Sequence, residues 1–187
     1  MREIALHLLD LAENSVSAGA KTIVITVCED LPADRLTASI QDDGRGMDAE
    51  TIRKVTDPFY TSRTTRKVGL GIPLLKGAAE ESNGSMSITS TLGQGTLVQV
   101  TFQHSHIDRM PLGDLPETFL ELTVGHPDTH WIFHYTARGP SHQDTFEFDD
   151  QPVKDMLTGV PLTHPDVLAY LRHHLEDGIR ETSQALQ

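Results

Sequence analysis

Apolar and polar positions follow a helical period over the first twenty residues of the chain. The apolar side is formed by Ile4, Leu8, Leu11 and Ala12, and the polar side by Glu3, His7, Asp10, Asn14 and Ser17. The polar side holds mostly short groups, whereas a solvated helix face is usually rich in Lys and long Glu. This helix, which ends near Gly19, is therefore a candidate carrier of chemistry, with a solvated face as the alternative.

Period-two alternation predicts a set of strands in the rest of the first half of the chain. The predicted strands cover residues 21–28, 36–41, 85–91 and 97–102. Between the two strand pairs we expect a short helix over residues 48–55, capped by Asp48, and a helix that starts near Pro73 and stops before Asn83 and Gly84.

Beyond residue 103 the pattern changes, and a linker over residues 104–116 is expected to separate two units. Strands are predicted over residues 118–124, 129–137 and 144–148, followed by a short helix over 152–157 capped by Asp149 or Asp150. Thr163 and Asp166 form a capping-box pattern for a final helix. The apolar face of that helix is formed by Val167, Leu168, Leu171, Leu175 and Ile179. The expected division is 1–103 and 117–187.

Charge narrows the choice of partners. The chain of 187 residues has a net charge of −12. Residues 1–103 hold ten Lys and Arg against thirteen acids, and the remainder holds five against fourteen. An acidic chain repels phosphate backbones, so we expect neither a nucleic-acid nor a membrane partner. The single cysteine excludes an intrachain disulfide, and the first residues do not form a signal peptide, so a cytoplasmic location is expected.

The predicted hairpin of the first half leads into Asp42-Asp43-Gly44-Arg45-Gly46-Met47. Two glycines around one residue let the backbone approach a flat ligand without an intervening Cβ. A carboxylate just before them can accept a hydrogen bond from an amine. A plain turn at the exit of a hairpin is the alternative interpretation.

A short basic segment interrupts the acidic chain at residues 61–68. It holds Arg63, Arg66 and Lys67, and it runs directly into Gly69-Leu70-Gly71 at the start of a predicted helix. Glycines before a helix N-terminus offer unpaired N–H groups to an anion. The segment is thus a candidate phosphate-facing loop, with an ordinary solvated loop as the alternative.

These features occur in the order that characterises one known superfamily. An acidic residue stands four before Asn14; Asp42 opens an Asp-x-Gly-x-Gly sequence; a basic segment precedes Gly-x-Gly; and Gly-Gln-Gly-Thr96 precedes a strand. The set resembles the GHKL ATPases, which include histidine kinases, gyrase B subunits, heat-shock chaperones and MutL-type repair proteins. Over residues 1–103 the resemblance implies a two-layer α/β (α+β) sandwich of the GHKL, or Bergerat, type, with a small C-terminal α/β unit added.

The resemblance also implies roles for individual residues toward ATP and Mg²⁺. Asn14 would offer its side-chain oxygen to Mg²⁺, and Asp42 would accept the adenine amino group, supported by Thr96 directly or through water. Gly46 would lie against the base. Further implied nucleotide contacts are Gly44, Met47, Gly69, Leu70 and Gly71, with Arg63, Arg66 and Lys67 as mobile charge partners of the phosphates.

Asp10 is the position that bears on catalysis. Hydrolytic branches of the superfamily carry Glu four residues before the metal-binding Asn, as general base, and many histidine kinases carry Asn there. Asp10 keeps base chemistry possible, although its side chain is one methylene shorter than that of Glu. His7, one turn earlier, would either assist or form a polar cap on the pocket rim.

The sequence mixes features of two branches. ENSVSAGA looks most like the first box of MutL, whereas TSTLGQGTLVQVTF looks most like the closing box of histidine kinases. No phosphoacceptor hairpin precedes the first box, so we expect a stand-alone ATP-binding domain with a C-terminal appendage. The strand that many relatives place before the first helix is also missing, so we expect the tail or a partner to complete the sheet.

The expected function is Mg-ATP binding coupled to phosphoryl transfer onto a protein, with the acidic C-terminal unit docking that partner. A non-catalytic ATP sensor and a slow ATPase are the alternatives, and a homodimer is left open. Nine of the ten histidines lie beyond residue 103. His130 and His134 fall on one strand face and could form a metal site, but scattered surface histidines are the favoured interpretation.

Overall fold

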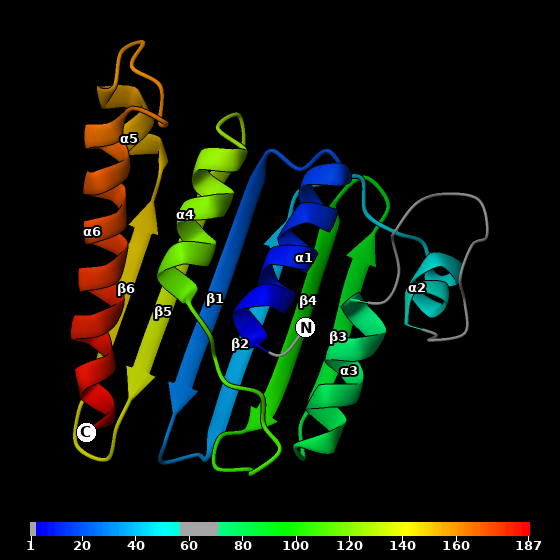
Figure 1. Cartoon of the computed structure of the whole chain (residues 1–187). Helices are drawn as coiled ribbons and strands as arrows, with labels where there is room; N and C mark the ends of the chain where they lie inside the picture. Colours follow the sequence, from blue (N-terminus) through cyan, green and yellow to red (C-terminus); the bar gives the residue numbers. More distant parts are fainter. Residues whose placement is uncertain (1–2, 57–70) are drawn as a thin grey trace.

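Six strands form one mixed sheet in the computed structural model, which describes residues 3–56 and 71–187 (Figure 1). The strand order is β3-β4-β2-β1-β5-β6. The strands are β1 (Thr22–Asp30), β2 (Arg35–Asp42), β3 (Ser85–Thr91), β4 (Gly95–Gln103), β5 (His130–Arg138) and β6 (Gln143–Asp149). The four strands predicted in the first half of the sequence are thus all present.

The C-terminal strands continue the sheet of the first half. β5 pairs with β1 in parallel, placing Phe133 beside Ile25, and β6 pairs with β5 in antiparallel fashion. Of the two possible ways to complete the sheet, the tail is the one that occurs. The division into units at residues 103 and 117 stays a prediction, but the two parts share one sheet.

Helices cover one face of this sheet and give a two-layer sandwich (Figure 1). α1 and α4 lie over the central strands, α3 over β3 and β4, and α6 over β5 and β6. The bounds are α1 (Ile4–Ser17), α2 (Ala49–Val55), α3 (Gly71–Glu81), α4 (Leu115–Gly125), α5 (Gln151–Met156) and α6 (Pro165–Ser183), with a terminal 3₁₀ turn, η1 (Gln184–Leu186).

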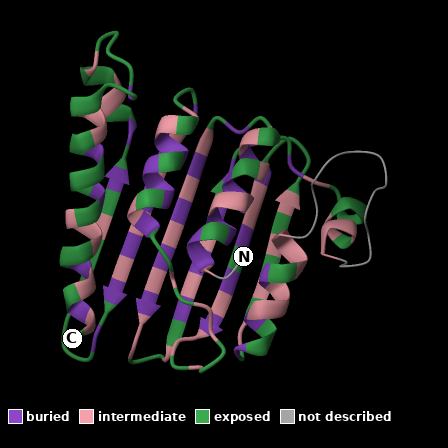
Figure 2. Ribbon diagram, viewed as in Figure 1, coloured by how far each residue is buried: buried purple, intermediate pink, exposed green. Residues whose placement is uncertain are grey.

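The core lies between the sheet and the helices. Alternate residues of β1, β2 and β5 are buried, which gives the stripes on these strands in Figure 2. On β1 these are Ile23, Ile25 and Val27, and they face the buried side of α1. Phe133 of β5 stacks on Phe119 of α4 with ring centroids 4.1 Å apart. The core is therefore continuous across both halves of the chain.

The strand predicted over residues 118–124 is wrong, because this segment is helical and forms α4. Asp114 caps the helix by accepting a hydrogen bond from the Glu117 N–H, and Pro116 stands in the first turn. The β-branched and aromatic residues of the segment favoured a strand locally. The segment is helical because a helix buries Phe119 and Leu122 against the sheet.

The segment over residues 104–116 contacts the start of α1, and the predicted cap of the final helix is wrong. The carbonyls of Pro111 and Leu112 accept hydrogen bonds from the N–H groups of Ile4 and Ala5, so this segment satisfies the free donors of α1. The first turn of α4 begins inside the predicted linker. The N-cap of α6 is His164, whose side chain accepts from the Asp166 N–H, and not Thr163.

The described helices are all too short or too polar to cross a lipid bilayer.

Candidate functional site

α1 presents Asp10 and Asn14 one turn apart on its half-buried side. Within residues 3–56 and 71–187, the Asn14 amide has no hydrogen-bond partner. The Asp10 carboxylate lies against Gly71, the first residue of α3. It is so close that a Cβ at Gly71 would overlap it. Burial, followed by the nearby Glu13 charge, raises the pKa of Asp10 above its usual value.

Asp42 ends β2 beneath this helix and is held by two donors. The Ser15 hydroxyl donates to Asp42 Oδ2 at 2.7 Å, and the Gly44 N–H donates to Oδ1 at 2.9 Å. Only 8% of the Asp42 surface is exposed. A buried carboxylate fixed by one donor on each oxygen keeps lone pairs for a further donor, such as an amine.

The neighbouring Asp43 binds the backbone at the start of β1. Its Oδ1 accepts from the N–H groups of Lys21, at 2.6 Å, and Thr22, at 3.0 Å. Burial alone would raise the pKa of Asp43, but these backbone donors outweigh it and lower the pKa. Of the two adjacent aspartates, Asp42 is therefore the one turned toward α1.

Gly46 must be glycine at its position beside Asp42. Its φ is +66°, and a Cβ there would overlap the Thr91 carbonyl. The Met47 N–H donates to Ser90 Oγ at 2.8 Å, which fastens this loop to the end of β3. The Gly44–Met47 turn is thus packed backbone to backbone against the β3–β4 turn.

Thr96 stands opposite Asp42 in the register of β4 and β2. In the described residues its hydroxyl bonds to Ser90 Oγ at 2.9 Å, and the direct bond to Asp42 comes from Ser15 instead. Thr96 therefore supports the loop of Met47 through Ser90. Whether it also reaches Asp42 through water stays a prediction.

The structure brings together Asp10, Asn14, Asp42, Gly44, Gly46, Met47, Gly71 and Thr96 at one end of the sheet. The expected phosphate contacts Arg63, Arg66, Lys67, Gly69 and Leu70 lie outside the described residues, and their roles stay predictions.

Two contacts were missed by the sequence interpretation. Ser15 directly follows Asn14 and lies four residues after Leu11 on the buried side of α1, a position that could have marked it as an inward-facing donor. Glu13 is turned away from the site. Its Oε1 lies 2.7 Å from Nε2 of His126, the residue that directly follows α4. No local signal could have paired residues so far apart in sequence.

His7 is buried rather than placed on an open rim. It is 2% exposed, and its Nδ1 finds no partner among the described groups. Burial lowers the pKa of this imidazole, which favours the neutral ring.

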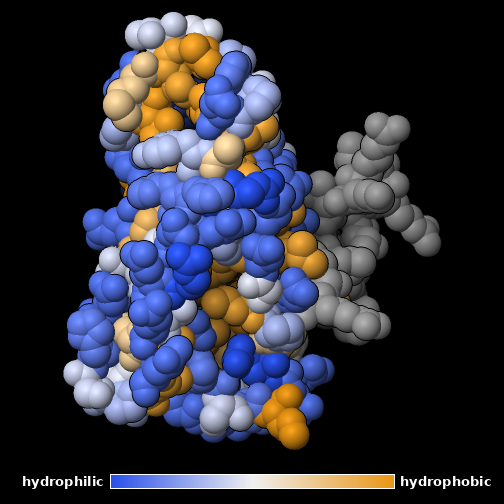
Figure 3. Space-filling view, turned by 60° about the vertical axis from the view of Figure 1, so that its left-hand side comes forward, coloured by the Kyte–Doolittle hydropathy of each residue, from blue (hydrophilic) through white to orange (hydrophobic). Residues whose placement is uncertain are grey.

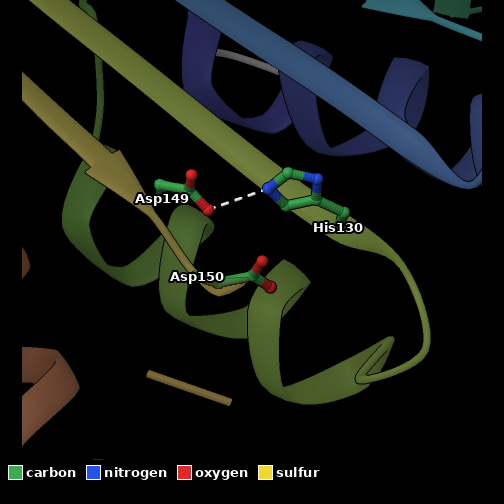
Figure 4. Close-up of side chains that lie close together, drawn as sticks. All are labelled: His130, Asp149 and Asp150. Carbon is green, nitrogen blue, oxygen red and sulfur yellow. Dashed lines mark hydrogen bonds and ion pairs between the residues drawn. The ribbon is translucent and has the colours of Figure 1, made fainter. Parts of the chain in front are cut away.

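His130 and His134 each lie beside a carboxylate. His130 Nε2 lies 2.8 Å from Asp149 Oδ1, and Asp150 lies beside them (Figure 4). Asp150 is 1% exposed, accepts from the Trp131 N–H and lies 2.6 Å from the Lys154 ammonium. That ammonium already supplies the positive charge that a metal ion would bring. His134 instead faces Glu147 at 3.5 Å, so in the described part of the chain the two histidines contact different carboxylates.

Comparison with known proteins identifies the family of the first half of the chain. The family model of histidine kinase-, DNA gyrase B- and HSP90-like ATPases matches residues 2–106. The chain is 29% identical over 92 residues to sporulation kinase C of Bacillus subtilis, covering 49% of this chain and 21% of that protein. It is 31% identical over 117 residues to a non-motile and phage-resistance protein of Caulobacter vibrioides, covering 58% and 14%.

The fold itself has a solved counterpart. The N-terminal domain of a DNA repair protein superposes with a TM-score of 0.53 at 15% identity, over 78% of this chain and 52% of that one. The chain matches about a fifth or less of the length of the two sequence relatives. With the family model matching more than half of its residues, the chain belongs to the histidine kinase-, DNA gyrase B- and HSP90-like ATPases.

Proposed function

We propose that this chain binds Mg-ATP and transfers the terminal phosphoryl group to a partner protein in a regulatory or signalling pathway. The observation that carries the proposal is the buried Asp42, fixed by Ser15 and Gly44 directly beneath the helix that presents Asn14 and Asp10. The similarity to sporulation kinase C supports the kinase form of the proposal.

The residues present fit an adenine nucleotide. Asp42 keeps acceptor capacity for the adenine amino group, because each of its oxygens accepts from one protein donor. The Asn14 amide, which has no hydrogen-bond partner among residues 3–56 and 71–187, offers an oxygen ligand, which suits a hard cation such as Mg²⁺. ATP would supply the phosphoryl group, and Mg²⁺ would neutralise charge on the phosphates.

Asp10 would act as the base toward the attacking group. Its carboxylate is half-buried, and its raised pKa makes it a better proton acceptor than an exposed aspartate once it is ionised. In the transfer, the acceptor oxygen or nitrogen bonds to the terminal phosphorus, the bond between that phosphorus and the bridging oxygen breaks, and ADP leaves. The acceptor's proton goes to Asp10.

A slow ATPase is the second candidate, favoured by the same Asp10 carboxylate. With water in place of a protein acceptor, the same steps release free phosphate. A non-catalytic ATP sensor would use the nucleotide pocket without either reaction.

The test is to incubate the purified chain with Mg²⁺ and ATP labelled at the terminal phosphate, and to follow free phosphate and labelled protein separately. Label on this chain or on an added partner supports the kinase. Free phosphate alone supports the ATPase. Binding of ATP with neither product supports the sensor and contradicts the catalytic proposal.

Two variants sharpen the assignment. Asp10→Asn should abolish the release of free phosphate while ATP still binds, because it removes the base and keeps the shape. Label that still reaches protein would show transfer without a base at this position, where many histidine kinases carry Asn. Asp42→Asn should weaken ATP binding about tenfold or more, because it sets an amide donor against an amine. Unchanged ATP binding by Asp42→Asn would show that adenine is bound elsewhere.

A further inference from the structure

A nearly wholly apolar hollow lies between α5 and the first half of α6, far along the chain from the candidate nucleotide site. Figure 3 shows apolar surface gathered around a hollow at one end of the molecule. The hollow has a volume of about 210 Å³. It is lined by Val153, Met156, Leu157, Asp166, Val167 and Tyr170.

The hollow exposes large apolar side chains that the fold leaves without cover. Met156 is 71% exposed and Tyr170 is 54% exposed. Exposed apolar residues that cluster, rather than stand singly, mark interaction sites. Met and Tyr are also residue types that are enriched at protein interfaces, Met because it adapts its shape and Tyr because it is rigid and large.

Its size favours a side chain over a small-molecule ligand. Pockets for small molecules usually measure about 300–1,000 Å³ and contain several converging polar groups. This hollow is smaller, and Asp166 is the one charged residue among those that line it. It therefore suits a single bulky aliphatic or aromatic side chain from another polypeptide.

The wall of the hollow is firmly held. α6 is anchored to the core by Leu171 and Leu175, both fully buried. At its N-terminal half, Arg172 forms an ion pair with Glu117 of α4. A rigid wall lowers the conformational entropy lost on binding, so little ordering is needed when a partner docks.

Charge around the hollow indicates which partner would fit. The Asp166 carboxylate is 95% exposed, and Asp155 is also exposed on α5. Lys154, the nearest cation in sequence, is bound to buried Asp150 and therefore does not offset them. Residues 104–187 together hold five Lys and Arg against fourteen Asp and Glu. The surroundings of the hollow are thus negative.

We propose that the α5–α6 hollow is a docking site for a protein segment that presents one bulky apolar side chain flanked by Lys or Arg. The apolar side chain would fill the hollow, and the flanking cations would face Asp155 and Asp166. A second copy of this acidic chain would bring like charges together, so a basic partner is favoured. This proposal adds a docking site for the partner protein to the proposed function. It rests on the proposed function only in taking that partner to be the phosphate acceptor.

The test is a selection from a display library of random linear peptides on the whole chain of 187 residues. Peptides are then screened against the double variant Met156→Ser/Tyr170→Ser. Both side chains are more than half exposed, so the variant keeps the core intact, which its thermal unfolding checks. The matched control is Ile107→Ser, which removes an apolar side chain that is 93% exposed in the segment after β4.

Peptides that bind the parent and the control, and bind the double variant at least about tenfold more weakly, should carry a Leu, Ile, Phe or Trp flanked by Lys or Arg. Asp155→Asn/Asp166→Asn should weaken the same peptides roughly two- to fivefold, and added salt should remove that difference. Failure to select such peptides, or selection of acidic ones, would overturn the proposal. So would a dimer of the chain that the double variant disrupts.

Peptide binding is measured without nucleotide and repeated with Asp42→Asn. The two proposals therefore fail separately. Loss of ATP binding with peptide binding retained contradicts only the nucleotide site, and the reverse contradicts only the docking site.

Discussion

The hydroxyl of Ser15 donates to Asp42 Oδ2 at 2.7 Å, which joins the helix that carries Asn14 to the strand that ends at Asp42. Ser15→Ala would leave this buried oxygen without its donor, at a cost of about 1–3 kcal/mol in stability. We expect ATP affinity to fall about threefold to tenfold, because Asp42 loses its orientation. Calorimetric titration with ATP and thermal unfolding measure the two effects. Ser17→Ala, an exposed change on the same helix, is the control and should alter neither.

Turnover should depend on pH through Asp10. Burial raises the pKa of this carboxyl, so its ionised, basic form is populated only at a higher pH than for an ordinary aspartate. The rate should therefore begin to fall at a higher pH than an ordinary aspartate base would give. The stability that the protonated group contributes is complete below its unfolded pKa and is lost as the pH rises through the folded one.

Product formation across pH, for the parent and Asp10→Glu, checks the role of Asp10. The longer side chain restores the reach of a glutamate base, and it should keep an acidic limb in the profile. Asp10→Asn should remove the release of free phosphate and, with it, the acidic limb of that reaction. A rate that is independent of pH in the parent would argue against Asp10 as the base.

Gly46 and Gly93 offer a matched pair of substitutions. Both have positive φ, +66° and +76°, but a Cβ would overlap the Thr91 carbonyl at Gly46 and would meet nothing within 4 Å at Gly93. Gly93→Ala should therefore lower the free energy of unfolding only by the cost of a positive φ in a residue with a Cβ, about 1–2 kcal/mol. Gly46→Ala should cost more and should also weaken ATP binding. Chemical denaturation measures the difference, and equal costs would contradict the close packing at Gly46.

Tyr135 links the C-terminal strands to the first half of the sheet. Its hydroxyl donates to Glu29 Oε1 at 2.7 Å, and His104 Nε2 lies 2.9 Å from the other oxygen of Glu29. Tyr135→Phe should lower the free energy of unfolding by about 1–3 kcal/mol, because Glu29 loses a buried donor. Thr136→Ser, on the half-buried side of the same strand, is the control and should cost much less.

The same tyrosine should resist ionisation. Burial, then the charge of Glu29, raises its pKa far above the usual value, so the neutral donor persists in the folded protein. Its contribution to stability is full below the ordinary tyrosine pKa and is lost as the pH rises through the folded pKa. Absorbance of one tyrosinate should therefore appear only with unfolding at alkaline pH. Tyr135→Phe should lack that step.

The order of local patterns was enough to predict the family and most of the elements. The helical period of the first twenty residues, the alternation in 21–28 and 36–41, and the glycines that flank Arg45 are set by nearest neighbours in sequence. Each reflects a local requirement, either for one buried face or for a backbone without a Cβ. For this reason the placements of Asp10, Asn14 and Asp42 on their elements could be read before the fold was known.

Only the tertiary structure decided contacts between distant segments. Residues 118–124 have strand-like composition, yet α4 forms there because its apolar side is buried on β5, which a local period cannot report. The Glu13–His126 and Ser15–Asp42 contacts, and the addition of β5 to β1, depend on which chain ends meet in space. Hydrogen bonds and burial between segments far apart in sequence form only when the whole chain is folded. Local sequence therefore determined which residues could form the site, and the tertiary structure determined which residues contact them.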